Sequence, residues 1–351
     1  MPQKRVVLAV HGGAGIILRS ALTPEMVAEY RSALQDALSA GYAVLDRSSR
    51  DDATNSNKAA VRCMEDCTLF NAGKGSVFAH DGHIRCDASI MSCSFDKAAY
   101  DSRDASCDKA EDDIISSDKE SSITTSGAIA GVGNIQNPIS LAKAVMIHTP
   151  HVMLIGKGAE DFARQLPKEA RRRWKQLVNV RESEKEEQQE QTQQVMKVQL
   201  DHSSTSQQEG SDMLRDKKFG TVGCIALYQP DSNENTYQLA SATSTGGMTN
   251  NVITALATHQ SLRLEYKYGY DGTSSAADNA LLKKALEEVI FGTLMSEDHA
   301  GEQGGDGGAI VLDKDGNFAA DMNCPGMYHG WVYEDGEMET SIFWDERVTK
   351  Q

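Results

Sequence analysis

Thr221 is the residue whose type and position best fit covalent catalysis. It follows Gly220, where a charged, glutamine-rich segment gives way to an apolar run over residues 222–227. A threonine becomes a good nucleophile mainly as the first residue of a chain, because its own α-amine can then take the proton from its hydroxyl. An α-amine titrates at about pH 7.7–8.0, so a useful share of it is free base near neutral pH. The chemistry indicated is nucleophilic catalysis by an N-terminal threonine.

Cleavage of the chain directly before Thr221 would create that N-terminus. Gly220 has no Cβ, so its peptide can adopt a strained geometry and leave its carbonyl carbon open to the threonine hydroxyl. Most Gly-Thr pairs that precede a strand are ordinary exits from turns. Here the pair directly follows a low-complexity segment, and this position favours autocleavage between Gly220 and Thr221.

Three other polar segments have both a chemical and a structural interpretation. Residues 11–15, HGGAG, could cradle an anion, but they lack the spacing of nucleotide-binding loops, so a close backbone approach in a crowded core is expected. Residues 71–75 form a tight turn, or their amide and carbonyl groups line a site or hold a hard cation. Residues 244–247 place hydroxyl groups at the end of a strand, where they contact substrate or only form a turn. The histidines show no metal-ligand grouping.

Composition excludes several classes of function. The chain has 351 residues and a net charge of −16, which argues against nucleic acid or an anionic membrane as partner. We expect neither a segment that spans a bilayer nor a signal peptide, since no apolar run is long enough for the first and the chain leads from Met1 straight into a short strand. Its seven cysteines are scattered and odd in number, which favours reduced thiols. We therefore expect a cytoplasmic protein.

The first half of the chain is predicted to alternate between strands and helices. The strands are expected at residues 5–10, 75–79, 84–91, 127–132 and 151–155, of which 75–79 and 84–91 form a hairpin through an Asp-Gly turn and 151–155 is buried. The helices are expected at residues 24–45, 58–66 and 159–165, with a further one starting at Asn137 and Pro138. Residues 51–57 are expected to be a loop, and residues 94–125 a surface insertion rich in Asp, Lys and Ser.

The second half begins with a segment that cannot bury much apolar area. Residues 167–218 are predicted to be disordered, because their apolar content is too low to offset the entropy of ordering them. Strands are expected again at 221–228 and 239–243, a helix at 276–294, and a last hairpin at 308–313 and 318–322. The chain therefore divides into residues 1–166, a linker at 167–220, and residues 221–351. This mixed order predicts a layered α/β (α+β) fold.

Eight motifs in one order closely resemble the plant-type L-asparaginase/isoaspartyl peptidase family of N-terminal-nucleophile threonine hydrolases. They are HGGAG at 11–15, LFNAGKGSV at 69–77, DASIM at 87–91, GAIAGVGNIQNPISLAKAVM at 127–146, HVMLIGKGAEDFA at 151–163, GTVG at 220–223, ATSTGGMTN at 242–250, and a glycine-rich segment at 304–328. The likeness covers nearly the whole chain outside the insertion and the linker.

This resemblance implies a four-layer αββα sandwich and a precursor that cleaves itself before the threonine of GTVG. The two resulting chains stay together and pair as a dimer of heterodimers. Thr221 matches the family's nucleophile, Thr245 the threonine that supports its activation, and Asn71 an asparagine beside the scissile bond. The loop near Leu69 and Phe70 resembles the segment whose carbonyls hold a structural sodium ion. No other cofactor is expected.

One departure concerns substrate binding. The family carries an Arg and an Asp that grip the substrate, and a Thr-Gly pair that forms the oxyanion hole, in a block after GGMTN. Here Asn251 runs directly into a segment that resembles the family's helix on the far side of this block. Only Gly246 and Gly247 remain as candidates for substrate contact. A true loss, a splice form and a faulty gene model all explain the gap.

The sequence predicts a threonine-type amidohydrolase that acts on L-asparagine and β-aspartyl dipeptides. Thr221 would attack the side-chain amide carbon, and water would hydrolyse the resulting ester. The first alternative is a family member that is catalytically impaired or inactive because the block after Asn251 is missing. The second is a hydrolase of altered specificity, for example an endopeptidase. A lysosomal glycosylasparaginase is disfavoured because no signal peptide is expected.

Overall fold

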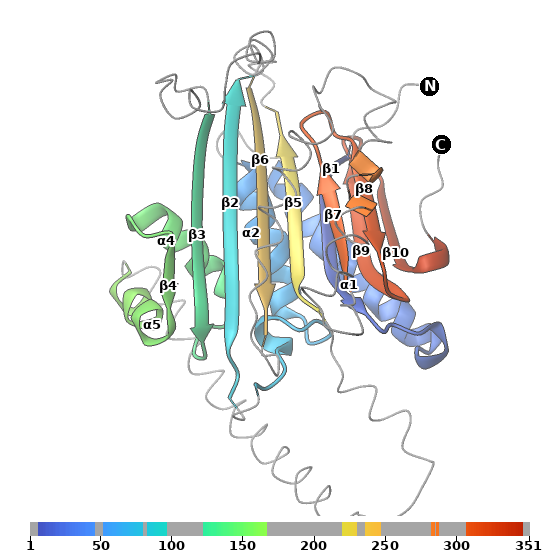
Figure 1. Ribbon diagram of the computed structural model, residues 1–351, viewed down its shortest axis with the longest axis horizontal. Coiled ribbons are helices and arrows are strands. Elements are labelled where there is room, and N and C mark those ends of the chain that lie inside the picture. The colour runs from blue at the N-terminus through green and yellow to red at the C-terminus, as the bar shows by residue number, and fades with distance from the viewer. Residues whose placement is uncertain are drawn as a thin grey trace, which may run out of the picture.

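A computed structural model describes residues 6–45, 52–79, 83–96, 122–166, 220–229, 236–246, 282–284, 286–287 and 307–346. Within these ranges the chain forms one large sheet, one small sheet and a layer of helices (Figure 1). The described part contains no helix that is both long and apolar enough to cross a membrane.

The large sheet has eight strands in the order β10-β9-β1-β5-β6-β2-β3-β4. Their bounds are β1 Val6–Gly15, β2 Cys86–Asp96, β3 Ser122–Val132, β4 Met153–Ile155, β5 Val222–Tyr228, β6 Thr236–Thr245, β9 Gly326–Tyr333 and β10 Met338–Phe343. All neighbours are antiparallel except β3 and β4. Strands β1, β5 and β6 are therefore central, although more than 200 residues separate β1 from β5.

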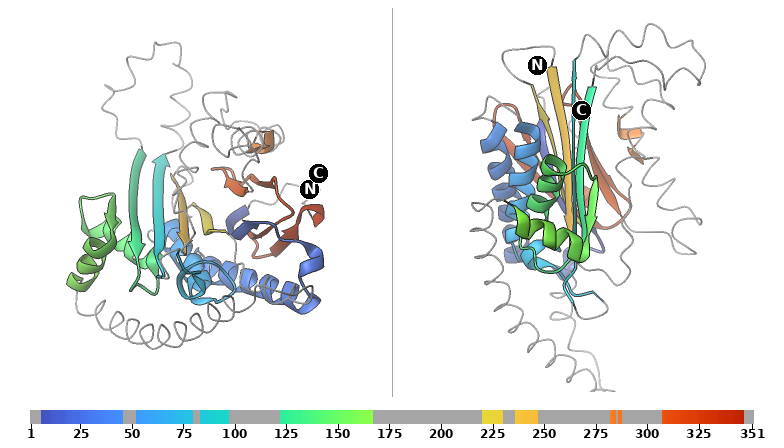
Figure 2. Two further views of the ribbon diagram at one scale, coloured as in Figure 1. Left: turned by 60° about the horizontal axis from the view of Figure 1, so that its bottom comes forward. Right: turned by 90° about the vertical axis from the view of Figure 1, so that its left-hand side faces the viewer.

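Helices α1 (Pro24–Leu45), α2 (Asp52–Asp66) and α4 (Pro138–His148) cover one face of this sheet (Figure 2). Leu34 and Leu38 of α1 pack in one buried cluster with Leu8 and Val10 of β1. Helix α5 (Gly156–Gln165) follows β4 and lies beside β3. The predicted helix at 24–45 is confirmed with its bounds, because its buried residues recur at the helical spacing.

The opposite face of the large sheet carries the two-stranded sheet of β7 (Gly308–Leu312) and β8 (Phe318–Met322). A second buried cluster joins the two sheets through Ala9, Leu227, Leu312 and Trp331. Leu282 and Leu286, in a short stretch of helix, pack against Ala319 of β8. The layers are thus helix, sheet, sheet and helix, and the predicted αββα sandwich is confirmed. The predicted hairpin at 308–322 is also confirmed.

Several expected boundaries are wrong. Helix α2 begins at Asp52, so the loop expected at 51–57 is wrong. The polar residues Thr54 and Asn57, which suggested a loop, are buried within the first turns of this helix. Strand β1 does not stop at Val10 but continues through HGGAG, where the ring of Phe70 would lie 2.4 Å from a Cβ on Gly12. This close approach is the interpretation that the sequence favoured for these glycines.

The strands around the expected insertion also differ from the prediction. Residues 76–79 form no strand; β2 starts at Cys86 and pairs with β3 and β6, so the predicted hairpin is wrong. Strands β2 and β3 extend into the expected insertion, where Ser94 pairs with Ile123. The edge strand β4 is exposed rather than buried. Residues 97–121 and the linker at 167–219 lie outside the described residues.

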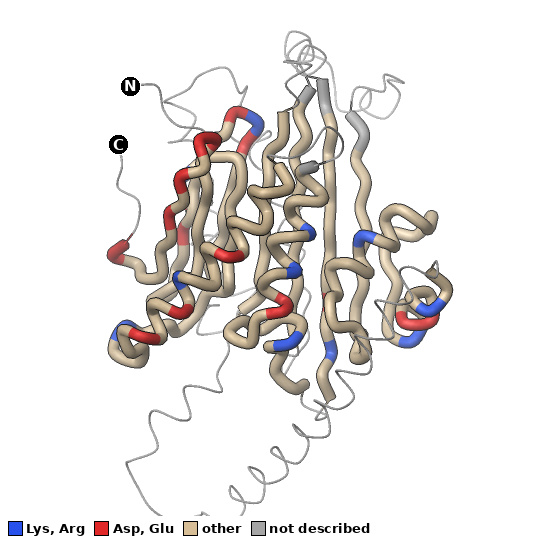
Figure 3. The backbone as a smooth tube through the Cα atoms, turned by 180° about the vertical axis from the view of Figure 1, so that it is seen from behind, with Lys and Arg blue, Asp and Glu red and all other residues tan. Residues whose placement is uncertain are grey.

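The two ends of the large sheet differ in character. At the β9–β10 end, Glu334, Asp335, Glu337 and Glu339 follow one another, and acidic residues gather there in Figure 3. At the β4 end, Val152 and Ile155 expose 63% and 66% of their surface. The β9–β10 end of the sheet, the acidic end, therefore carries negative charge. The edge strand β4, at the apolar end, exposes apolar side chains.

Candidate active site

Thr221 lies immediately before β5, at the centre of the large sheet, and Gly220 precedes it in a conformation that requires glycine. Gly220 has φ +90, in the left-handed region. A Cβ at this position would lie 2.5 Å from Gly13 Cα and 2.8 Å from Ala14 N of β1. Neither contact can be relieved by moving a side chain. The bond between Gly220 and Thr221 is therefore held against the glycine-rich end of β1.

Thr245 is the last residue of β6, next to β5. The register pairs Val222 with Ser244, so the next position places Thr221 opposite Thr245. Side chains alternate between the two faces of a strand. Ile225 of β5 and Leu239 of β6 pack toward the small sheet, and Thr221 and Thr245 share their parity. The two hydroxyl groups thus lie on the same face, as neighbours on adjacent strands.

Asn71 is buried and tied to the end of β6. Its carbonyl oxygen accepts a hydrogen bond from Gly246 N at 2.9 Å, and its Oδ1 accepts one from Val77 N at 3.0 Å. The Thr245 hydroxyl is 3.4 Å from Gly246 O. The structure thus brings Thr221, Thr245, Asn71 and Gly246 to one end of β5 and β6. Gly247 lies outside the described residues.

Sequence reasoning assigned no role to His11 in this arrangement. His11 pairs with Gly223 of β5, and a Cβ on Gly223 would lie 2.3 Å from His11 Nε2. The pKa of His11 is lowered to about 4, because burial and the neighbouring His329 together outweigh an interaction with the Thr221 backbone that raises it. The sequence signal that could have identified His11 is its place directly before Gly12 and Gly13 in β1. Its contact with Thr221 depends on strand register.

Asp87, in the DASIM motif, was also missed as a neighbour of the site. It pairs with Thr245 across β2 and β6, and its Oδ1 accepts a hydrogen bond from Gly131 N at 2.6 Å. Burial raises the pKa of this carboxyl group. Asp87 therefore supports the glycine turn at the end of β3 and flanks Thr245 on the side away from Thr221.

A third missed residue, Glu65, lies on the helical side of the sheet. Its side chain is fully buried, and its Oε1 accepts a hydrogen bond from Ile139 N at 2.9 Å, at the start of α4. The pKa of Glu65 is raised to about 8, because burial outweighs the hydrogen bond from Ile139, which acts in the opposite direction. The carboxyl group thus joins α2 to the start of α4.

The loop between α2 and β2 supplies converging main-chain oxygens. A Cβ on Gly75 would lie 2.1 Å from Phe70 O and 2.9 Å from Thr68 O. Carbonyl oxygens are the ligands that hard cations prefer. The described residues contain no group of three or more His, Cys, Asp or Glu side chains that could hold a metal. Any ion in this loop would therefore be held by the backbone, which fits the donor set expected near Leu69 and Phe70.

Comparison with known proteins identifies the family of this chain. The asparaginase family model matches residues 4–99 and 118–254. The chain belongs to the asparaginase family. The isoaspartyl peptidase of Salmonella typhimurium is 30% identical over 97% of this chain and 99% of its own length, and that of Escherichia coli is 31% identical over 97% and 96%. A putative isoaspartyl peptidase/L-asparaginase of Dictyostelium discoideum is 31% identical over 96% of both chains.

The two segments of this asparaginase-family chain that match the family model are separated by a gap, which can be located in the structure. The gap in the match, between residues 99 and 118, falls where β2 and β3 are joined outside the described residues. The match ends at residue 254, three residues after Asn251, the position at which the sequence predicts a missing block. Residues 247–281, which include this position, lie outside the described residues.

Proposed function

We propose that the chain is a self-cleaving threonine amidohydrolase that acts on the β-amide of L-asparagine and of isoaspartyl dipeptides. The names of the full-length relatives support the substrate class. The observation that carries the proposal is the junction at the start of β5. There Gly220, in a left-handed conformation and packed against the backbone of β1, precedes Thr221, and strand register puts Thr245 opposite Thr221.

Self-cleavage follows from this junction. The Thr221 hydroxyl attacks the Gly220 carbonyl carbon, and the C–N bond to Thr221 breaks as an ester forms on the threonine oxygen. The released nitrogen takes up a proton and becomes the α-amine of Thr221. Water then hydrolyses the ester, which leaves a carboxylate on Gly220 and a free hydroxyl on Thr221. Residues 1–220 and 221–351 stay together because β5 lies between β1 and β6.

Substrate hydrolysis repeats the same chemistry. The free α-amine takes the proton from the Thr221 hydroxyl, whose oxygen attacks the side-chain amide carbon of the substrate. The leaving nitrogen departs with that proton as ammonia or as the amine of a peptide. Water hydrolyses the β-aspartyl ester and restores the threonine. Thr245 supports the activation of Thr221, and Asn71 holds the end of β6 in place.

The proposal extends to the ion, the assembly and the compartment. A structural sodium ion fits the main-chain oxygens of the loop near Leu69 and Phe70. Two processed heterodimers would pair, and the exposed apolar surface around β4 supports such an interface. The cytoplasmic location stays a prediction.

Replacing the nucleophile tests the proposal. The purified wild-type protein is expected to contain two fragments, of which the second begins with Thr221. The Thr221→Ala variant is expected to stay in one piece and to lose hydrolysis of β-aspartyl dipeptides by at least about 1,000-fold. Mass spectrometry identifies the cleavage site, and aspartate release measures activity.

Thr125→Ala is the matched control, because Thr125 is an exposed threonine on β3. It should be processed and active like the wild type. A wild-type chain that stays intact after long incubation, or a Thr221→Ala chain that is cleaved at the same bond, would contradict the proposal.

A further inference from the structure

The side chain of His11 packs directly against the backbone of Gly223 on the neighbouring strand. They face each other across β1 and β5. The His11 ring occupies the space that a side chain on residue 223 would fill, since Nε2 would be 2.3 Å and Cδ2 2.8 Å from a Cβ there. Contacts under 3.0 Å force a displacement. The glycine of the GTVG motif therefore leaves room for a ring next to Thr221.

The His11 ring also lies near the backbone of Thr221, two residues before Gly223 in the chain. Its interaction with that backbone raises the pKa of His11, as a ring N–H that donates to a carbonyl oxygen does. Burial nevertheless holds the pKa at about 4, and the ring is neutral at pH 7. It is then a weaker base than an α-amine, which titrates at about 7.7–8.0. His11 is thus suited to hold Thr221 in place, and the amine to take its proton.

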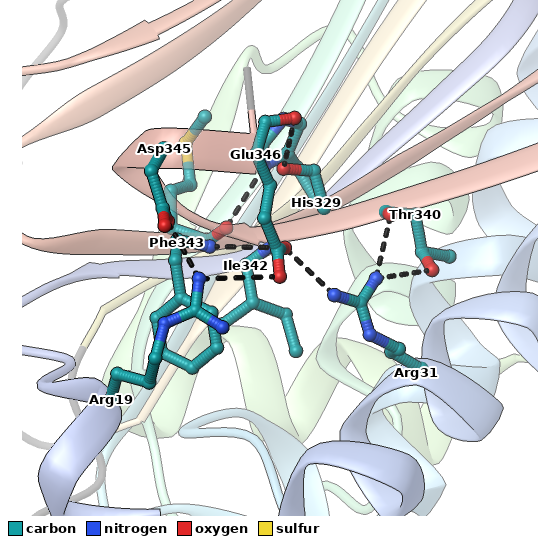
Figure 4. Close-up of polar contacts among 10 residues, drawn as sticks. Arg19, Arg31, His329, Thr340, Ile342, Phe343, Asp345 and Glu346 are labelled. Carbon is teal, nitrogen blue, oxygen red and sulfur yellow. Dashed lines mark hydrogen bonds and ion pairs between the residues drawn. The ribbon is translucent and has the colours of Figure 1, made fainter. Parts of the chain in front are cut away.

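His329 is the cross-strand neighbour of His11 on the other side of β1. It pairs with His11 across β1 and β9, is 2% exposed, and stacks on Trp331 with ring centroids 5.8 Å apart. Its Nδ1 lies 2.9 Å from Met327 O, and because a carbonyl only accepts, Nδ1 carries the proton. Figure 4 shows His329 beside Glu346, whose carboxylate binds Arg31 at 2.7 Å. The ring behind His11 is therefore itself fixed.

We propose that His11 is a positioning residue for the nucleophile, whose ring, seated on Gly223 and backed by His329, donates a hydrogen bond to the Thr221 carbonyl and fixes the new N-terminal residue. This inference rests on the proposed function. Cleavage removes the covalent link between Thr221 and Gly220, and chain ends fray unless they are tied down. Strand pairing holds Val222 and the residues after it. His11 extends that hold to Thr221.

Kinetics of three variants test the role. His11→Phe keeps an aromatic ring but has no donor, Gly223→Ala pushes the ring away, and His11→Gln restores an N–H of similar reach. His11→Phe and Gly223→Ala are expected to lower kcat by about 10- to 100-fold, the cost of a misplaced reacting group, with KM changed by less than about threefold. His11→Gln should recover most of the loss. His151→Phe is the control, because His151 is exposed.

Hydrogen exchange separates this inference from the proposed function. In processed His11→Phe, the amides at the start of β5 should exchange faster than in processed wild type, while those of β2 and β3 stay unchanged. Faster exchange in a protein whose wild type hydrolyses nothing would remove the proposed function and leave the positioning role standing. Unchanged exchange, or a His11→Phe kcat equal to that of wild type, would overturn the inference.

Discussion

Glu65 couples the pH of the solution to the stability of the fold. Its pKa is raised to about 8 because the carboxyl group is buried, whereas its ordinary value is 4.5. The folded chain thus binds this proton more tightly than the unfolded chain does. The contribution of the group to stability is complete below pH 4.5 and is lost as the pH rises toward 8. The slope in this range is about 1.4 kcal/mol per pH unit.

Glu65→Gln should therefore remove a pH dependence from unfolding. Glutamine keeps the shape and the neutral state of the protonated acid. In a Thr221→Ala background, which keeps the chain in one piece, the Glu65→Gln variant should gain stability over its parent as the pH rises from 5 to 8. Urea unfolding at several pH values measures the difference. A difference that stays constant with pH would show that Glu65 is already ionised in the folded chain.

Glu160→Gln is the matched control. Hydrogen bonds from Gly133 and Asn134 lower the pKa of Glu160 and outweigh its partial burial. Its contribution to stability is present above pH 4.5 and is lost only as the pH falls through the lowered folded value. The difference between Glu160→Gln and its parent should therefore stay constant between pH 5 and 8.

Single residues were predictable where their chemistry is local. Thr221 and Gly220 could be selected because a nucleophile and the peptide bond before it are adjacent in the chain, and a left-handed glycine fits that role. His11 and Glu65 could not be selected. The role of His11 comes from its contact with Gly223 of β5, which depends on strand register. That of Glu65 comes from its hydrogen bond with the backbone at the start of α4.

At the scale of elements, helices were predicted better than strand partners. Helix α1 follows from its own periodicity. Strand β2 was assigned to a hairpin through Asp81 and Gly82, a local signal, but its partners are β3 and β6. The polar ends of β2 and β3 fall within the predicted insertion at 94–125, because a segment rich in Asp, Lys and Ser and low in apolar residues predicts a loop. Strands β9 and β10 were not predicted, although β9 is buried over most of its length.

The loop near Leu69 and Phe70 gives a prediction at the same scale. A sodium ion held there stabilises only the folded chain, by about 1.4 kcal/mol when sodium is at ten times its dissociation constant. Replacing sodium chloride with N-methylglucamine chloride at equal ionic strength should lower Tm by a few degrees. Gly75→Ala, whose Cβ would meet Phe70 O at 2.1 Å, should lose this dependence. Equal Tm values for wild type in the two salts would show that the loop needs no sodium.

For the whole molecule, the layer order was predicted through the family resemblance and not through composition. The charge of −16 follows from the sequence, and the structure places a row of acidic residues in and beside the turn at the β9–β10 end of the large sheet (Figure 3). The apolar end was missed for a physical reason. The run at 151–155 reads as a buried strand, and only the strand order shows that β4 pairs with β3 alone and stands at the edge.

That edge gives the last prediction. Ile147, Val152, Met153 and Ile155 expose between 43% and 66% of their surface around β4. An exposed strand edge with large apolar side chains is commonly covered, since it otherwise promotes aggregation. A second copy of the chain would cover it, and the acidic far end would stay in solvent. The protein should therefore have a mass near twice 38.1 kDa in light scattering.

Charges placed on this edge should separate the copies. Val152→Asp with Ile155→Asp is expected to halve the mass, because two carboxylates per chain would have to be buried at an apolar contact. Ile16→Asp with Leu18→Asp is the control, since both residues are exposed apolar side chains near η1 (Arg19–Ala21), away from β4. It should leave the mass unchanged. A double variant at β4 that keeps the full mass and the folded core would place the interface elsewhere.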